Sequence, residues 1–220
     1  MDTTVVLVED HPLFSKGLLQ LIESEKGFIV AGEARTGEEA LSLIKEKKPQ
    51  FAIVDLNLGD EDGLEIIKML KQEQPSLFVL VLSMFDERYY AERALKAGAH
   101  GYIMKEEAPH KVIDAIKTIL SGKIWLSDNE RDHLYEYISG NSAKETDKWC
   151  ASINTLSNRQ LQIFNMIGKG LGTIEIANKL NLSTKTIDAH KEHIKQKLHC
   201  NSSQELRQLA VECNSRLITK

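Results

Sequence analysis

The run Phe51-Ala52-Ile53-Val54-Asp55 decides the fold of this chain. Four apolar residues followed by a carboxylate are typical of a strand buried in a parallel sheet, with a polar side chain where the strand ends. The same pattern occurs where Val5–Val8 leads to Glu9 and Asp10, Phe78–Leu82 to Ser83, and Tyr102–Met104 to Lys105. Because sites in open parallel sheets form beyond the carboxyl ends of the strands, we expect these side chains to meet at one edge.

A weaker apolar run, Phe28–Ala31, completes a set of five strands. Helical stripes of apolar residues lie between the strands, and one of them includes Leu64, Ile67 and Leu70. Alternating strands and helices of this kind predict an α/β domain. Its core is expected to be a five-stranded, doubly wound parallel sheet with helices on both faces.

The charge of the chain is divided unevenly along its length. Up to Cys150 there are 18 Lys and Arg residues and 27 Asp and Glu residues, a net charge of −9. The remainder has 10 basic and 5 acidic residues, a net charge of +5. At 220 residues the chain can form two domains. The asymmetry favours an acidic first domain and a basic second domain that meets a polyanion.

Several classes of protein are excluded by composition. No apolar stretch approaches the roughly 20 residues of a membrane-spanning helix, and the N-terminus lacks the pattern of a signal peptide. The three cysteines, Cys150, Cys200 and Cys213, match no metal-ligand spacing. We therefore expect a soluble cytoplasmic protein with reduced thiols and no membrane partner.

The second part of the chain is predicted to be helical throughout. We expect a first domain over 1–125, a partly helical linker over 126–153, and a small all-α domain over 154–220. A Ser-x-x-Gln capping box at Ser157 begins its first helix. Helices over Thr173–Leu180 and Thr184–Leu198 are separated by a three-residue turn. Such a pair predicts a helix-turn-helix unit.

The residues expected at the sheet edge suit phosphoryl chemistry. Mg²⁺ binds few carboxylates and completes its shell with water and phosphate oxygens, so Glu9, Asp10 and Asp55 could hold it. Asp55 could then attack phosphorus and form an aspartyl phosphate. Lys105 would offset the charge on the transferring oxygens, and the Ser83 hydroxyl would bind the phosphoryl group.

The first part of the chain resembles the flavodoxin-like receiver domain of two-component response regulators. The resemblance is carried by the stretch Val8-Glu9-Asp10-His11, the run Asp55–Gly63, Ser83 and Lys105. The resemblance implies that a histidine kinase or phosphotransfer protein phosphorylates Asp55. It also implies that the backbone carbonyl of Asn57 joins the three carboxylates around Mg²⁺. Tyr102 matches the aromatic switch position of the family. Such a protein is a phosphoacceptor with slow autodephosphorylation at most, rather than an enzyme.

Two positions depart from the receiver pattern. Where the family commonly has proline four residues after the acceptor, this chain has Gly59, which is expected to loosen the loop without removing a ligand. The lysine of the last strand is followed by Glu106 instead of the common proline. Neither departure is interpreted as a loss of function.

The helix over Thr184–Leu198 has one face for packing and one for reading DNA. Ile187, Ile194 and Leu198 form the inward stripe. The outward face would enter the major groove, and its candidate contacts are Lys185, Thr186, Asp188, Ala189 and Glu192. Candidates for contacts to the DNA phosphates are Lys179, Lys195 and Lys197.

The second part of the chain resembles a LuxR-type DNA-binding domain. The residues that carry this resemblance include Leu156–Gln160, Glu175-Ile176-Ala177, Ser183-Thr184 and Lys197-Leu198. A receiver followed by such a domain resembles the NarL/FixJ subfamily of transcription factors, which implies a homodimer on inverted half-sites of double-stranded DNA, with RNA polymerase as a further partner. Gln160 stands where the family usually has glutamate, and Asp188 and Glu192 often align with lysine. The operator therefore cannot be copied from relatives.

These observations predict a transcription regulator controlled by phosphorylation of Asp55, which switches dimerisation and promoter binding. The dimer could form through the fourth and fifth helices or through the first and fifth. A phosphatase with an aspartate nucleophile is the alternative from another class. It would need an acid two residues after Asp55, where Asn57 stands. A third hypothesis keeps the fold but replaces phosphate by a ligand or partner.

Overall fold

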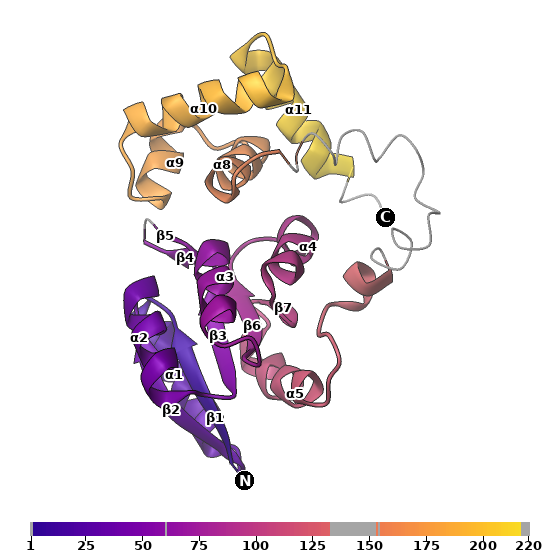
Figure 1. Cartoon of the computed structure of the whole chain (residues 1–220). Helices are drawn as coiled ribbons and strands as arrows, with labels where there is room; N and C mark the ends of the chain where they lie inside the picture. Colours follow the sequence, from indigo (N-terminus) through magenta and orange to yellow (C-terminus); the bar gives the residue numbers. More distant parts are fainter. Residues whose placement is uncertain (1, 60, 133–152, 154, 217–220) are drawn as a thin grey trace. The chain divides into compact units, whose positions relative to one another are not determined.

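The chain divides into two units, Met1–Ile138 and Ser139–Lys220. The structure is a computed structural model, and it describes residues 2–59, 61–132, 153 and 155–216 (Figure 1).

The first unit is built on one five-stranded parallel sheet. Its strands are β1 (Thr3–Val8), β2 (Phe28–Ala34), β3 (Phe51–Asp55), β6 (Phe78–Ser83) and β7 (Gly101–Met104). The order across the sheet is β2-β1-β3-β6-β7, which is the doubly wound arrangement that the sequence predicts. Every residue of the central strand β3 is buried, as its uninterrupted apolar run requires.

Five helices cover this sheet. They are α1 (Pro12–Ser24), α2 (Gly37–Lys47), α3 (Gly63–Glu73), α4 (Glu87–Ala97) and α5 (Ala108–Leu120). Helices α1 and α5 pack Leu18, Ile22 and Ile116 against buried strand residues, including Ile53, in a single apolar cluster. Helix α3 contacts both α2 and α4. The helices therefore enclose the strands and leave the carboxyl edge of the sheet to the loops.

A short antiparallel pair follows the central strand, and the sequence did not predict it. It consists of β4 (Asn57–Leu58) and β5 (Glu61–Asp62). Gly63 then begins α3 at a close crossing, where a Cβ atom would lie 2.5 Å from the Asp55 carbonyl oxygen. Glycine at this position thus lets α3 start directly against the loop that carries Asp55.

The segment after α5 packs on the same unit. Trp125 forms a parallel bridge with Gly101 of β7, and Leu126 is buried. Residues 128–132 are helical, and Ser127 Oγ accepts from the Glu130 N–H at 3.3 Å, as expected for the helix start. The predicted continuation of this helix and most of the predicted linker, 133–152 and 154, lie outside the described residues.

The second unit contains α8 (Asn158–Gly168), α9 (Thr173–Lys179), α10 (Thr184–Leu198) and α11 (Ser203–Arg216). The bounds of α9 and α10 agree with the predicted helices to within one residue, and the Ser157–Gln160 capping box that begins α8 is present. The buried residues at the centre include Leu161, Phe164, Ile176, Ile187, Ile194 and Leu206.

Within the part of the chain that the structure describes, no helix is both long and apolar enough to cross a membrane.

Candidate phosphoryl site and nucleic-acid interface

Four predicted site residues lie together at the carboxyl ends of the strands. Glu9, Asp55, Ser83 and Lys105 follow or end β1, β3, β6 and β7, and all four side chains are buried. Lys105 Nζ lies 2.6 Å from Glu9 Oε2 and 2.7 Å from Asp55 Oδ2. One ammonium group thus joins carboxylates that are far apart in the sequence.

Burial and charge act on this cluster in opposite directions. The pKa of Asp55 is raised from 3.8 to about 6, because burial, with a smaller contribution from the Glu9 carboxylate, outweighs the lowering by the Lys105 ammonium. Burial also lowers the pKa of Lys105, but Asp55 and Glu9 outweigh burial, so the net pKa is raised. Lys105 therefore stays protonated beside the carboxylate that is expected to react.

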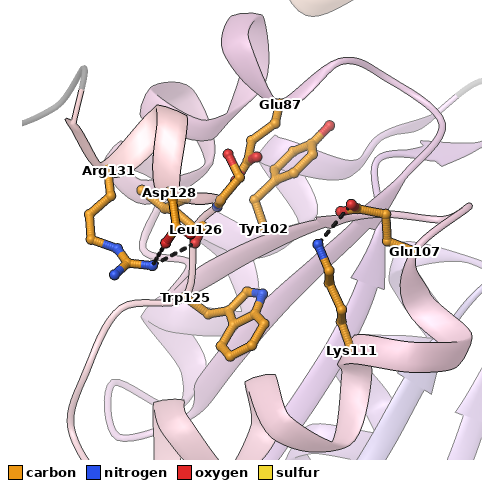
Figure 2. A pocket seen from close by; sticks show the side chains of 9 residues that line it. Glu87, Tyr102, Glu107, Lys111, Trp125, Leu126, Asp128 and Arg131 are labelled. Atoms are coloured by element: carbon orange, nitrogen blue, oxygen red, sulfur yellow. Dashed lines mark hydrogen bonds and ion pairs between the residues drawn. The ribbon is translucent and has the colours of Figure 1, made fainter.

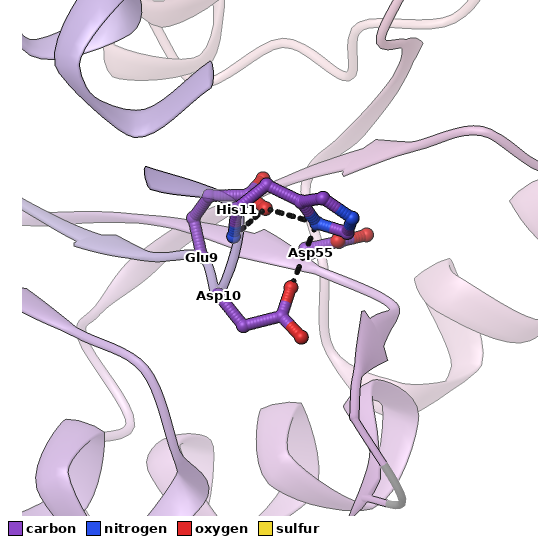
Figure 3. Close-up of side chains that lie close together, drawn as sticks. All are labelled: Glu9, Asp10, His11 and Asp55. Atoms are coloured by element: carbon purple, nitrogen blue, oxygen red, sulfur yellow. Dashed lines mark hydrogen bonds and ion pairs between the residues drawn. The ribbon is translucent and has the colours of Figure 1, made fainter. Parts of the chain in front are cut away.

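The donor groups around this cluster fit a divalent cation. Glu9, Asp10, His11 and Asp55 each offer one ligand atom, and these atoms all lie within 4.8 Å of one another (Figure 3). Asp10 Oδ1 is buried and accepts no hydrogen bond, while Asp10 Oδ2 accepts from the Gly59 N–H at 3.0 Å. The neighbour of Oδ1 is the His11 Nδ1 atom, 2.8 Å away. Three carboxylates held this close repel one another unless a cation offsets their charge, and oxygen ligands suit Mg²⁺.

Gly59 explains how Asp10 is held. Its φ of 55° lies in the left-handed region, which proline cannot adopt, and its N–H is the donor to Asp10. The sequence predicted only a looser loop at this departure from the family pattern. The structure shows that glycine fixes a carboxylate of the site.

The predicted switch residues meet at the loop after β6. Ser83 Oγ accepts from the Phe85 N–H at 3.1 Å, and the Tyr102 hydroxyl donates to the Phe85 carbonyl oxygen at 2.8 Å. Tyr102 is 1% exposed, and burial raises the pKa of its hydroxyl well above 10. The side chains of Tyr102 and Ser83 therefore both form hydrogen bonds with the backbone of Phe85.

The segment 124–131, which we call the strap, is attached to these elements. The Tyr102 N–H donates to the Trp125 carbonyl oxygen at 2.9 Å, and the Ser127 N–H donates to Glu87 Oε1 at 2.9 Å. A pocket of about 230 Å³ lies beside it (Figure 2). The pocket is lined by Glu87, Tyr102, Glu107, Lys111, Trp125, Leu126, Ser127, Asp128 and Arg131. The strap thus contacts both Tyr102, the predicted switch residue, and Glu87, the first residue of α4.

Helices α9 and α10 form the predicted helix-turn-helix. Asn181, with φ of 52°, makes the turn between them, and Ser183 caps α10 by accepting from the Thr186 N–H at 3.0 Å. Thr186 is half-buried, and the Ile187 side chain points into the core. Six of the predicted DNA contacts are exposed, namely Lys179, Lys185, Asp188, Ala189, Glu192 and Lys197.

Two of the predicted phosphate contacts are engaged within the domain. Lys197 Nζ donates to the Thr155 carbonyl oxygen and to Gln160 Oε1, both at 2.9 Å. Lys195 Nζ lies 2.8 Å from Glu192 Oε1. Lys197 therefore ties α10 to the start of α8, a role for which the sequence pattern gave no separate signal.

Several residues that contribute to the candidate phosphoryl site were not predicted from the sequence. His11 was part of the motif but had no role, although its position beside two carboxylates was a signal. The Gly59 amide and the Phe85 carbonyl gave none, because backbone groups do not depend on residue type. Glu87 and Trp125 join the site through the strap, whose docking requires the folded sheet.

The comparisons with known proteins agree with this geometry. Residues 5–117 match the response regulator receiver domain, and residues 154–210 match the luxR family of bacterial regulatory proteins. The chain belongs to the response regulators, and it combines a receiver with a LuxR-family DNA-binding domain.

Two relatives span nearly the whole chain. The oxygen regulatory protein NreC of Staphylococcus epidermidis is 31% identical over 94% of this chain and 96% of its own. The virulence-factor transcription regulator BvgA of Bordetella pertussis is 34% identical, over 97% and 99% respectively. The structure of RcsB from Salmonella enterica serovar Typhimurium, bound to promoter rprA with the phosphomimetic BeF3−, is 25% identical. It matches with a TM-score of 0.60 over 96% of this chain and 99% of that chain.

Proposed function

We propose that Asp55 accepts a phosphoryl group from a histidine kinase or phosphotransfer protein, and that this switches dimerisation and promoter binding. The observation that carries the proposal is the position of Lys105, which lies within 2.7 Å of Asp55 Oδ2 and 2.6 Å of Glu9 Oε2. A buried ammonium group beside the acceptor can offset charge on the transferring oxygens.

The chemistry is a displacement at phosphorus. A carboxylate oxygen of Asp55 attacks the phosphorus of a phosphohistidine, the P–N bond breaks, and its electron pair stays on the departing imidazole. Glu9, Asp10, Asp55 and the Asn57 backbone carbonyl would hold Mg²⁺, which supplies charge neutralisation when bound. Lys105 then keeps its ammonium group against the new phosphoryl oxygens, and the Ser83 hydroxyl donates to one of them.

The loop between β6 and α4 would couple phosphorylation of Asp55 to a conformational change outside the site. Ser83 and Tyr102 both bind Phe85, and Glu87, two residues later, accepts from Ser127 of the strap. When Ser83 turns to the phosphoryl group, the Phe85 backbone and the Tyr102 ring rearrange. Because Tyr102 and Glu87 each hold the strap, their rearrangement changes how the strap docks.

The second domain would carry the output. Lys185, Thr186, Asp188, Ala189 and Glu192 would face base edges in the major groove, with Lys179, Lys195 and Lys197 near phosphates. The active species would be a homodimer on double-stranded DNA in the cytoplasm, with RNA polymerase as a further partner. The structure of RcsB bound to a promoter with a phosphomimetic supports DNA binding by the second domain.

Intact mass after incubation with Mg²⁺ and acetyl phosphate tests the acceptor. We expect one added phosphoryl group on the wild-type chain and none on Asp55→Asn or without Mg²⁺. Asp114→Asn, which changes an exposed aspartate on α5, serves as the matched control and should be phosphorylated normally. Phosphorylation of Asp55→Asn at the wild-type level would refute the site.

A folded protein that gains no mass needs a second measurement. Beryllium fluoride with Mg²⁺ mimics the phosphoryl group without turnover, and we expect it to form a stable complex that requires Asp55. If the complex forms, rapid hydrolysis explains the missing mass. If it does not form, phosphate control is excluded, and regulation by a ligand or partner takes its place.

A further inference from the structure

His11 is the one nitrogen donor of the acidic cluster formed by Glu9, Asp10, His11 and Asp55. Its Nδ1 atom lies 3.1 Å from Glu9 Oε1 and 2.8 Å from Asp10 Oδ1, an oxygen that is buried. Its backbone N–H also donates to Glu9 Oε1 at 2.9 Å. The imidazole is therefore directed at the carboxylates and not away from them (Figure 3).

The local structure does not need the imidazole in this position. His11 is the N-cap residue of α1, but its side chain makes no capping hydrogen bond. Pro12 follows at the first helical position, where proline is favoured in any case. The ring is 62% exposed, so burial of apolar surface does not fix it either. What its position does achieve is to bring a nitrogen donor to a group of oxygen donors.

We propose that His11 Nδ1 is a ligand that lets this site hold a divalent transition-metal ion more tightly than three carboxylates would alone. Mg²⁺ prefers oxygen and gains little from imidazole, whereas Co²⁺, Ni²⁺ and Zn²⁺ bind imidazole nitrogen well. On binding, Nδ1 would coordinate the ion through its lone pair. The inference rests on the metal site of the proposed function and adds selectivity to it.

The test compares two metals on the full-length protein. Calorimetric titrations with Co²⁺ and Mg²⁺ would be made on wild type, His11→Asn and His193→Ala. Asparagine keeps a hydrogen-bond donor and is a favoured N-cap residue, so the variant should fold. His193 is exposed on α10 and controls for adventitious binding by histidine. We expect His11→Asn to weaken Co²⁺ on the order of tenfold or more, as loss of a metal-site residue does, with Mg²⁺ changed less than threefold.

Spectroscopy provides a readout that an orienting role would not change. Pulsed electron paramagnetic resonance of the Mn²⁺ complex should detect a directly coordinated nitrogen in wild type and His193→Ala. That signal should be absent from His11→Asn.

The outcomes separate the two proposals. If wild type binds neither Mg²⁺ nor Co²⁺, the metal site of the proposed function fails, and this inference fails with it. If Mg²⁺ binds but His11→Asn weakens both metals equally, His11 only orients Glu9 and Asp10, and the inference alone is overturned. Unchanged Co²⁺ affinity with no nitrogen signal overturns it as well.

Discussion

At the scale of single residues, Gly59 shows how a departure from a family pattern can become a requirement. Its N–H holds Asp10 Oδ2 at 3.0 Å, and its φ is 55°. We expect Gly59→Pro, which introduces the common family residue, to lower Mg²⁺ affinity on the order of tenfold. The free energy of unfolding should fall by about 2 kcal/mol, because proline lacks the donor and is fixed near a φ of about −65°.

Alanine at the same position separates the two causes. Gly59→Ala keeps the N–H donor but strains the left-handed backbone, at a cost of about 1–2 kcal/mol. Its Mg²⁺ affinity should therefore stay closer to wild type than that of Gly59→Pro. Calorimetric Mg²⁺ titration and thermal unfolding measure the two effects. Equal affinities for the two variants would show that the hydrogen bond to Asp10 does not matter.

Gln160 is a second informative residue. Its Oε1 accepts from the Ser157 N–H at 3.0 Å and from Lys197 Nζ at 2.9 Å. Gln160→Glu places a carboxylate against both donors, and charge-assisted hydrogen bonds are about twice as strong as neutral ones. We expect the second domain to gain about 1 kcal/mol, measured as a rise in its unfolding midpoint. In a Lys197→Met background most of the gain should disappear, and a gain of the same size there would contradict the argument.

At the scale of elements, the strap should respond to pH. Burial is the main reason that the pKa of Glu130 is raised from 4.5 to about 7, and the charges of Glu87 and Asp86 contribute to the same rise. The docked strap therefore binds more protons than the undocked strap between these values, so docking weakens as pH rises through about 7 and is constant above it. Hydrogen exchange over 124–132, corrected for the intrinsic rate, should show less protection at pH 8 than at pH 6.

Variants identify the group that titrates. Glu130→Gln cannot ionise and should flatten the pH dependence of strap protection. Asp128→Asn removes a carboxylate that is 92% exposed on the same turn, and it should leave the profile unchanged. If strap protection in Glu130→Gln depends on pH as it does in wild type, Glu130 is not the group that titrates. Glu87, whose pKa is also raised by burial, would then be the group responsible.

Two glycine-to-alanine changes test how closely the strap packs on β7. A Cβ atom on Gly101 would lie 2.9 Å from the Trp125 carbonyl oxygen and 2.9 Å from Ile119 Cδ1. Gly101→Ala should therefore push the strap away and destabilise the receiver by about 1–3 kcal/mol. Gly17 lies inside α1 with nothing within 4 Å of such an atom. Gly17→Ala should instead stabilise by about 0.5–1 kcal/mol. Chemical denaturation measures both, and the two effects should have opposite signs.

The elements also show what the sequence could and could not predict. Glu9, Asp55, Ser83 and Lys105 could be placed together because parallel strands bring their carboxyl ends to one edge. The β4–β5 pair and the docking of the strap on β7 and α4 were not predicted, because neither depends on an apolar periodicity in the sequence. Trp125 finds its place only by pairing with Gly101, a backbone contact that depends on the finished sheet. The role of Lys197 could not be predicted either. The helical pattern of the sequence does not distinguish a lysine that faces solvent from a lysine that donates to Gln160.

At the scale of the whole molecule, the question is what phosphorylation changes when the protein binds DNA. The basic second part, with a net charge of +5, is expected to supply the contacts to DNA phosphates. The logarithm of a DNA-binding constant falls with the logarithm of salt concentration, with a slope of about −0.9 per phosphate contacted. A dimer on two half-sites contacts about twice as many phosphates as one chain. Release of a single chain from inhibition raises affinity without changing that number.

We therefore expect beryllium fluoride with Mg²⁺ to about double the slope measured on a two-half-site DNA, because the proposed active species is a homodimer. Fluorescence anisotropy at a series of salt concentrations measures it, and Asp55→Asn should keep the shallower slope under all conditions. On this duplex Lys179→Ala, which removes an exposed candidate phosphate contact, should reduce the magnitude of the slope of the activated protein by about two, one phosphate contact from each chain. Lys197→Ala should chiefly lower stability, because its ammonium group binds Thr155 and Gln160 within the domain. Higher affinity with an unchanged slope would show that phosphorylation acts within one chain, and the dimer would then have to be abandoned as the switch.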